Sequence, residues 1–349
     1  MAFIKQYRPA FIAVFYYWAL IFVIGMTLML IDHASGGHRA VFYACNIVAL
    51  WFWLDALYAL FLGLRRWCWE HTAARDENGV LANAAPYTLE GESPREPRTA
   101  ILFIHGFADT PETWQLLAPR VHALTGATCR VMRLPFISAP PRLQHRATLD
   151  AWLDAVRDEV ARLRACHKKV FVAGHSLGGG LALLSSGSIL LPSGQPREQD
   201  APATLDGVIL FAPLIHTPRW CGIPLSALFA IADRAMLFTR VLHNHFPAVI
   251  KTKDGRVYDY PRDRYIAFAI YRSLFKMTRR LGKNKTREQD APATLAFLSL
   301  RDRVIDTPRA LRYLAGAKII TTQEAGHVLT LDTGWEQRAE EIAAFISRA

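Results

Sequence analysis

One serine in this chain lies in a setting that favours nucleophilic chemistry. The segment KKVFVAGHSLGGG places Ser176 in a Gly-x-Ser-x-Gly frame from Gly174 to Gly178, after an apolar run and before a run of small residues. A strand that turns sharply into a helix at such a serine lifts the hydroxyl off the sheet, and the flanking glycines remove side chains that would clash. The amino end of a helix beginning at Leu177 would also favour developing negative charge. We therefore expect Ser176 to be a nucleophile.

The chain around Ser176 alternates apolar runs with segments of helical spacing. TAILFIHGF, KKVFVAG and DGVILFAP are continuous apolar runs bounded by turns, as buried strands are. Residues 148–165 instead repeat their apolar positions with the period of a helix. This alternation predicts an α/β fold over residues 99–349, with a mostly parallel central sheet and helices on both faces. A cap insertion is expected at about 214–294.

The motifs FIHGF, GHSLGG, LSLRDRVID and AGHVLTLD resemble those of the α/β-hydrolase superfamily. Within it they are most similar to the carboxylesterase and monoacylglycerol-lipase group. The resemblance covers roughly residues 99–349 and is thin between 214 and 294. It implies an α/β-hydrolase fold with a helical cap insertion, and an activity that needs neither cofactor nor metal. The five cysteines form no CxxC pair and no Cys/His ligand spacing, so no zinc site is predicted.

The same resemblance identifies a base and an acid, because this fold orders its catalytic triad Ser, acid, His along the chain. His327 is the candidate base, since it lies in a late loop before the last predicted helix. Asp302 comes two residues after the predicted strand TLAFLSL and would hold the imidazole in its productive tautomer. Asp306 competes for this role. However, Asp306-Thr307-Pro308 is typical of a helix start, so Asp302 is preferred.

Two backbone N–H groups are needed to bind the oxyanion. We expect one at Leu177, directly after the nucleophile. We expect the other at Phe107, the last residue of the FIHGF motif, in the loop that follows the strand. His105 is expected to shape that loop rather than to react. In the implied mechanism Ser176 attacks an ester carbonyl while His327 takes its proton. Water activated by His327 then releases the acid from the acyl-enzyme.

Two long apolar runs precede this region. Residues 11–31 carry no charge and residues 40–64 form a second run, and each is long enough to cross a hydrocarbon core of ~30 Å as a helix. We predict an N-terminal transmembrane hairpin over residues 1–69 and a linker over 70–98. A buried core helix is the alternative for either run. It is the stronger alternative for the second, because Asp55 would place a carboxylate in mid-span.

Lysine and arginine near the ends of these runs predict an orientation. Lys5 and Arg8 precede the first run, Arg65 and Arg66 follow the second, and the short loop between the runs holds only Arg39. Both termini, and with them the hydrolase region, are therefore expected on the cytoplasmic side of a membrane protein with two spans.

The net charge of +11 is confined to the predicted cap. From His216 to Arg287 there are fifteen Lys/Arg and four Asp/Glu, a net of +11, whereas the rest of the chain holds 26 residues of each sign. Residues 266–281 of this region form an amphipathic pattern with basic residues off the apolar face. Two interpretations of this basic cap remain. It contacts anionic lipid, or it is a solvated face over an apolar core. No nucleic-acid-binding motif accompanies the charge, so nucleic acid is not an expected partner.

The expected function is hydrolysis of carboxylic esters at a membrane, with a lipid-like or acyl-ester small molecule as substrate. A thioesterase or an acyltransferase would use the same triad and differ only in leaving group or acceptor. A non-catalytic membrane scaffold with a hydrolase fold is the remaining alternative, and Ser176, Asp302 and His327 argue against it. The sequence predicts no particular oligomeric state.

Overall fold

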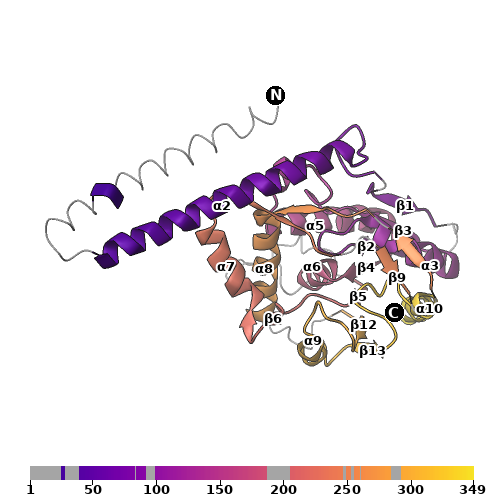
Figure 1. The fold of residues 1–349 in the computed structure, drawn as a ribbon. Coiled ribbons are helices and arrows are strands. Elements are labelled where there is room, and N and C mark those ends of the chain that lie inside the picture. Colours follow the sequence, from indigo (N-terminus) through magenta and orange to yellow (C-terminus); the bar gives the residue numbers. More distant parts are fainter. Residues whose placement is uncertain are drawn as a thin grey trace. The chain divides into compact units, whose positions relative to one another are not determined.

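The structure is a computed structural model that divides into two compact units (Figure 1). Unit 1 comprises Met1–Ala73 and Ala227–His243, and unit 2 comprises Ala74–Ser226 and Asn244–Ala349. The residues that the structure describes are 25–27, 39–82, 84–91, 99–186, 205–246, 249–252, 255–259, 261–283 and 292–349. The first predicted membrane span, 11–31, lies outside them except for residues 25–27, so the predicted two-helix hairpin is not seen.

Unit 2 is built on a seven-stranded sheet with the strand order β1-β3-β2-β4-β5-β12-β13. Strand β1 is an antiparallel edge strand, and the other neighbouring strands pair in parallel. The interior strands are buried along nearly their whole length, which is why their sequences are continuously apolar. The strands are β1 (Tyr87–Leu89), β2 (Thr99–Ile104), β3 (Thr128–Met132), β4 (Lys169–His175), β5 (Gly207–Phe211), β12 (Thr294–Ser299) and β13 (Lys318–Thr322).

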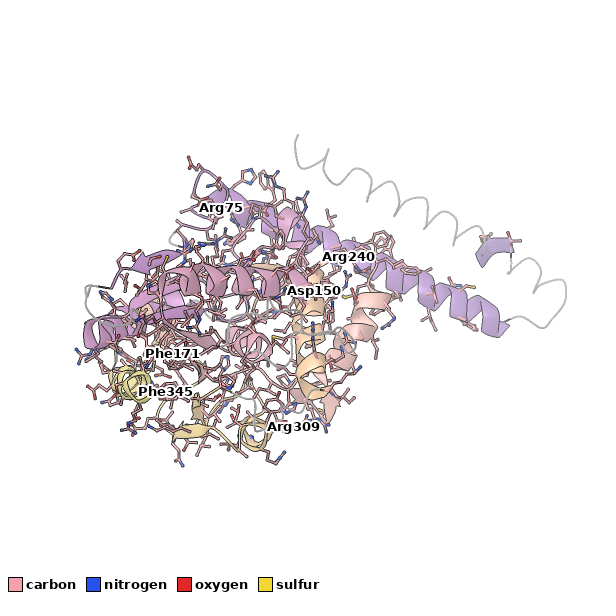
Figure 2. All side chains as sticks on the ribbon, turned by 180° about the vertical axis from the view of Figure 1, so that it is seen from behind. Arg75, Asp150, Phe171, Arg240, Arg309 and Phe345 are labelled. Carbon is pink, nitrogen blue, oxygen red and sulfur yellow. The ribbon has the colours of Figure 1, made fainter. Side chains whose placement is uncertain are left out.

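Helices cover both faces of this sheet, as predicted. Helix α3 (Leu117–Thr125) packs against α10 (Trp335–Arg348), and α5 (Leu149–Cys166) packs against α6 (Leu177–Ser185). In Figure 1 the two pairs lie on opposite sides of the strands. Phe345 of α10 packs on Phe171 of β4 with ring centroids 6.1 Å apart (Figure 2). The shorter helices of unit 2 are η1 (Pro111–Trp114), α4 (Pro141–Gln144) and α9 (Thr307–Tyr313).

An aromatic cluster supports the strand ends that carry the candidate site. Trp114 of η1 lies 5.0 Å from Phe103 of β2 and 5.5 Å from Phe211 of β5, between ring centroids. Phe211 stacks on Phe297 of β12 at 4.7 Å. All four rings are almost completely buried. Such close-packed interiors resist deformation, so the loops that follow these strands start from fixed positions.

The segment predicted to be a cap insertion lies between β5 and β12, and its most basic helix is packed into the protein. Ile266, Ile270, Leu274 and Leu281 form the predicted apolar face, and each is at most 7% exposed. This face therefore belongs to the core and is not free to enter a membrane. The cap elements are β6 (Arg219–Trp220), β7 (Ile223–Pro224), α7 (Leu225–Ala235), β8 (Val241–His243), β9 (Val249–Lys251), β10 (Val257–Asp259), β11 (Tyr265–Ala267) and α8 (Phe268–Lys283).

In the part of unit 1 that the structure describes, α2 (Arg39–Thr72) is a long helix that includes the whole of the second predicted span, 40–64. By length and composition alone, its segment Tyr43–Thr72 could cross a membrane. Large apolar side chains along it are exposed, among them Ile47 and Phe61. The part of the cap insertion that contains most of α7 belongs to this unit.

Candidate active site

Ser176 lies at the turn between β4 and α6, with φ 51° and ψ −110°. A positive φ is strained for a residue with a side chain, so the surroundings must hold it in place. The Ser176 N–H donates to the Phe211 carbonyl at 2.9 Å, and the Ser176 carbonyl accepts from Gly180 and Leu214. A Cβ on Gly178 would collide with the carbonyl of Ile104. The glycine frame thus has the steric purpose that the sequence predicted.

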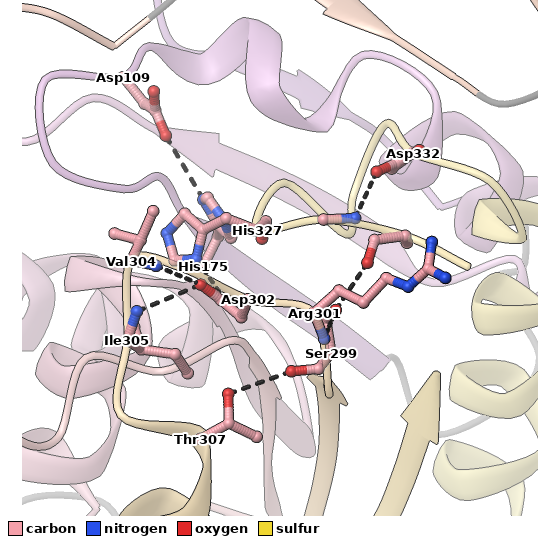
Figure 3. A network of polar contacts seen from close by, with 12 residues as sticks. Asp109, His175, Ser299, Arg301, Asp302, Val304, Ile305, Thr307, His327 and Asp332 are labelled. Atoms are coloured by element: carbon pink, nitrogen blue, oxygen red, sulfur yellow. Dashed lines mark hydrogen bonds and ion pairs between the residues drawn. The ribbon is translucent and has the colours of Figure 1, made fainter. Parts of the chain in front are cut away.

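Asp302 and His327 form a direct pair (Figure 3). His327 Nδ1 lies 2.7 Å from Asp302 Oδ2, and Asp302 Oδ1 accepts from the N–H groups of Val304 and Ile305 at 2.7 and 3.1 Å. Burial alone would raise the pKa of Asp302, but the hydrogen bonds from His327 and the two N–H groups lower it below its ordinary value. The carboxylate is therefore ionised and accepts the Nδ1 proton, which leaves Nε2 of His327 free to act as a base.

Asp306, the competing acid, has a different task. Its Oδ1 accepts from the Arg309 N–H at 3.1 Å, so it caps the amino end of α9. This is the helix-start role that the sequence predicted. The structure thus pairs Asp302, and not Asp306, with His327.

The loop that carries His327 is held by several polar contacts. Asp332 Oδ2 accepts from the Gly326 N–H at 2.6 Å. Arg338, a buried residue of α10, donates to three carbonyl groups between residues 329 and 333. A buried charge needs such partners because its desolvation is costly. The imidazole is therefore presented from a fixed loop. No sequence motif indicates this role of Arg338.

The end of β4 lies next to this loop. The rings of His175 and His327 have centroids 5.0 Å apart, and His175 Nε2 lies 3.2 Å from the His327 carbonyl oxygen. Among the described residues, no hydrogen bond joins the Ser176 hydroxyl to the His327 imidazole. In structures without substrate this contact is often longer than in the reactive complex. His327 thus lies next to His175, the residue before the nucleophile, and the proton contact between Ser176 and His327 stays a prediction.

The two expected oxyanion donors follow paired strand ends. Ile104 of β2 is in register with Gly174 of β4, and Phe107 and Leu177 each come three residues later. Leu177 is the first residue of α6, where a backbone N–H has no partner within the helix. In the part of the chain that the structure describes, neither N–H donates to another group. Neither N–H group is thus committed to another acceptor, and their convergence on one oxyanion stays a prediction.

His105 shapes the loop of Phe107, which fits the structural role expected for it. Its Nε2 accepts from the Leu134 N–H at 3.0 Å, so its proton is on Nδ1, which donates to the Gly106 carbonyl at 2.9 Å. Burial lowers the pKa of His105 to about 4. The ring is therefore neutral near pH 7 and remains a fixed part of the turn.

A second buried pair, Asp109 and His175, lies beside the site, and no sequence motif indicates a role for it. Asp109 Oδ2 is 3.4 Å from His175 Nδ1 (Figure 3), and Arg262 of the cap donates to Asp109 Oδ1. Burial would raise the pKa of Asp109, but Arg262 and His175 hold it below its ordinary value. The contacts run from the cap through Asp109 and His175 to the backbone of His327. Because Asp109 and Arg262 are 153 positions apart, no local pattern signals them.

Among the described residues, no group of three or more His, Cys, Asp or Glu side chains could hold a metal ion.

Solved structures of lipolytic enzymes resemble this one. One belongs to a study of LipS and LipT, two metagenome-derived lipolytic enzymes (19% identity, 77% of this chain and 100% of that chain covered, TM-score 0.63). A second is a monoacylglycerol lipase from Paleococcus ferrophilus (17% identity, 76% of this chain and 98% of that chain covered, TM-score 0.56). A third is a soluble variant of monoglyceride lipase from Saccharomyces cerevisiae (14% identity, 75% of this chain and 91% of that chain covered, TM-score 0.56). At these identities the likeness shows a shared fold and no more.

No curated protein sequence matches the chain. A family model does match: the one described as "Alpha/beta hydrolase family" aligns with residues 101–345, from β2 into α10. The strand order, the turn at Ser176 and the Asp302–His327 pair agree with that match. The chain belongs to the alpha/beta hydrolase family.

Proposed function

We propose that this protein is a membrane-anchored serine hydrolase that cleaves carboxylic esters. The observation that carries the proposal is the Asp302–His327 pair, 2.7 Å apart, whose imidazole contacts His175, the residue before the strained turn of Ser176. An ionised acid that orients an imidazole next to a serine on a sharp turn is the arrangement that makes a serine nucleophilic. A scaffold without turnover would have no need for this strain or for a buried carboxylate.

In the proposed reaction, the Ser176 oxygen attacks the ester carbonyl and His327 Nε2 takes the hydroxyl proton. Asp302 stabilises the imidazolium, and the N–H groups of Phe107 and Leu177 bind the oxyanion. His327 then gives the proton to the leaving alcohol as the C–O bond breaks. A water molecule, deprotonated by His327, attacks the acyl-enzyme, and Ser176 regains its proton as the acid leaves.

The proposed substrate is a lipid-like acyl ester. The similar monoacylglycerol lipases support this class of substrate, and so does the apolar helix α2. We propose that α2 anchors the protein in a bilayer, that residues 11–31 provide a second span, and that the hydrolase unit lies on the cytoplasmic side. The positive residues Arg65 and Arg66 at one end of the apolar stretch support this orientation.

A substrate series tests the proposed function. The full chain in detergent micelles is assayed on p-nitrophenyl esters of graded acyl length and on acyl thioesters of the same lengths, with Ser176→Ala as the matched control. We expect ester hydrolysis, faster on medium and long chains than on acetate, and loss of it in the control. Turnover of thioesters alone would assign a thioesterase. Equal rates in the control would contradict the role of Ser176.

A further inference from the structure

Asp55, in the middle of the apolar helix α2, is bound by the cap insertion. It is 3% exposed, and its carboxylate accepts from the N–H groups of Phe238 at 2.9 Å and Thr239 at 3.2 Å. The Thr239 hydroxyl also donates to the Asp55 carbonyl at 3.3 Å. All three residues belong to unit 1. The carboxylate in this apolar helix therefore receives its hydrogen bonds from the turn that follows α7.

The carboxyl end of α7 is closed by protein groups. Arg240 donates to the carbonyls of Asp233 and Met236 at 3.2 and 3.0 Å, and it also forms an ion pair with the Asp233 carboxylate at 3.4 Å. The Trp51 indole of α2 donates to the Ala235 carbonyl at 2.9 Å. The last carbonyls of a helix normally need water or a capping group. Here two of them, those of Asp233 and Ala235, and the carbonyl of Met236 directly after the helix accept from protein groups. Backbone at membrane depth requires such partners.

The side chains around this closed end are apolar and exposed. Ile231 of α7 is 65% exposed and Leu237 of the turn 47%. On α2, Phe61 and Leu64 lie between Asp55 and Arg65, and they are 51% and 45% exposed. Satisfied backbone beneath exposed apolar side chains suits a hydrocarbon environment better than water. The exposed Arg234 has a stem long enough to bring its charge to lipid headgroups.

The helix geometry sets the depth of Asp55. From Arg39 to Arg65, α2 rises about 39 Å, which exceeds a hydrocarbon core of about 30 Å. Asp55 is about 15 Å from Arg65, so it lies about 6 to 15 Å inside the core at that end. Helix α7 is about 16 Å long, so a chain that enters at the membrane surface can reach the depth of Asp55 along it. The four residues from Arg240 to His243, when extended, span about 13 Å and can bring the chain back toward that surface.

We propose that residues 225–240 form a re-entrant segment, with its exposed apolar side chains among lipid acyl chains, that enters the leaflet at the Arg65 end of α2 and is held at its tip by Asp55. The inference rests on the proposed membrane anchor and is independent of the proposed ester hydrolysis. It gives Asp55 a structural purpose. It also places part of the cap insertion among acyl chains, where a lipid-like substrate is found.

Spin labels on the full chain test this proposal. Cys45, Cys68, Cys166 and Cys221 are replaced by Ala, and single nitroxides are attached at Ile231→Cys, at Leu50→Cys on α2, or at Asp158→Cys on α5. The proteins are reconstituted in vesicles of phosphatidylcholine and phosphatidylglycerol. Power-saturation spectroscopy then measures the accessibility of each label to oxygen, which partitions into lipid, and to a water-soluble nickel chelate.

We expect the label at residue 231 to match the one at residue 50, with high oxygen and low nickel accessibility, while the label at residue 158 shows the reverse. If residue 50 is in lipid and residue 231 matches residue 158, the re-entrant segment is wrong and the anchor stands. If both are in water, the inference and the anchor are both wrong. None of these readouts depends on ester hydrolysis.

A substitution tests the role of Asp55 directly. Asp55→Ala removes the acceptor of the Phe238 and Thr239 N–H groups. Unpaired N–H groups are costly in hydrocarbon, so the label at residue 231 should shift toward the nickel-accessible values of residue 158. The label at residue 50 should not change. An unchanged residue 231 label would overturn the role assigned to Asp55.

Discussion

At the scale of single residues, the chemistry depends on what holds His327. Its Nδ1 faces an ionised Asp302. Its backbone carbonyl lies 3.2 Å from Nε2 of His175, the residue before the nucleophile. Two carboxylates lie within four positions of each other in this part of the chain, and only one of them contacts the imidazole. Asp302 and Asp306 are therefore a matched pair for experiment.

Asp302→Asn should lower kcat by about 10⁴-fold, because an amide would donate to Nδ1 and leave the proton on Nε2. Asp306→Asn should leave kcat unchanged, since asparagine caps a helix as well as aspartate does. Steady-state kinetics on a p-nitrophenyl ester measures both variants. Similar losses in the two variants would show that the contact with His327 has no special catalytic weight.

Arg262 and Asp109 should behave as a coupled pair. Arg262→Met leaves the Asp109 carboxylate buried without its main partner, so the free energy of unfolding should fall by about 3–5 kcal/mol. Adding Asp109→Asn should restore most of that loss, because no buried charge then remains unpaired. Urea unfolding in detergent, followed by tryptophan fluorescence, measures these changes.

Arg309→Met provides the control for this pair. Arg309 is half-exposed and lies 4.0 Å from Asp306, so its loss should change stability by less than about 1 kcal/mol. A double variant of Asp109 and Arg262 that is as unstable as Arg262→Met alone would contradict the coupling.

At the scale of elements, parallel strands that end at one edge bring the site together. β2 and β4 are in register, so the loops after them start side by side. The sequence could predict this much, because a buried strand, a sharp turn and a small-residue helix leave local patterns around Ser176. The placement of Asp302 could also be predicted, since a strand end and a helix cap differ in their neighbouring residues.

Long-range contacts could not be predicted in this way. Asp109 with Arg262, and Asp55 with Thr239, join residues more than 150 positions apart and leave no periodic signal. The amphipathic pattern of residues 266–281 was equally ambiguous, because an apolar helix face looks the same whether it meets protein or lipid. Only the burial of Ile270 and its neighbours in the structure shows that this helix face packs against protein.

One cap contact predicts a pH dependence. Asp263 is buried, and burial raises its pKa to about 7, although Ser138 donates its N–H to Oδ2. Between its ordinary pKa of 3.8 and about 7, the folded state keeps a proton that the unfolded state releases. The contribution of this group to stability is therefore present at low pH and is lost as the pH rises through this window.

Asp263→Asn should remove that contribution, since the amide oxygen can still accept from Ser138 and carries no charge. The midpoint of thermal unfolding in detergent is measured from pH 4 to pH 8. We expect a smaller decrease with rising pH in the variant than in the parent protein. An identical pH profile would show that Asp263 is not protonated in the folded state.

At the scale of the whole molecule, a hydrolase unit and a long apolar helix belong to one chain. The positive residues Arg65 and Arg66, at one end of the apolar stretch of α2, predict that the hydrolase unit lies on the cytoplasmic side. Cys166 is exposed on α5, so it reports on the location of this unit. With the other cysteines replaced, a membrane-impermeant maleimide should label Cys166 only after intact cells are permeabilised. Labelling before permeabilisation would reverse the orientation.

A position in the predicted loop between the two spans provides the positive control for this measurement. Gly36→Cys, in a chain without other accessible cysteines, should be labelled in intact cells. If it is labelled only after permeabilisation, the two-span topology is wrong.

The most direct test of the central claim is labelling of the full chain with a fluorophosphonate probe, which reacts with activated serines. Mass spectrometry of the digested protein should find the adduct on Ser176. Ser176→Ala should not react, and His327→Ala should react far more slowly than the parent protein. An adduct on another serine, or labelling that persists in Ser176→Ala, would contradict the account.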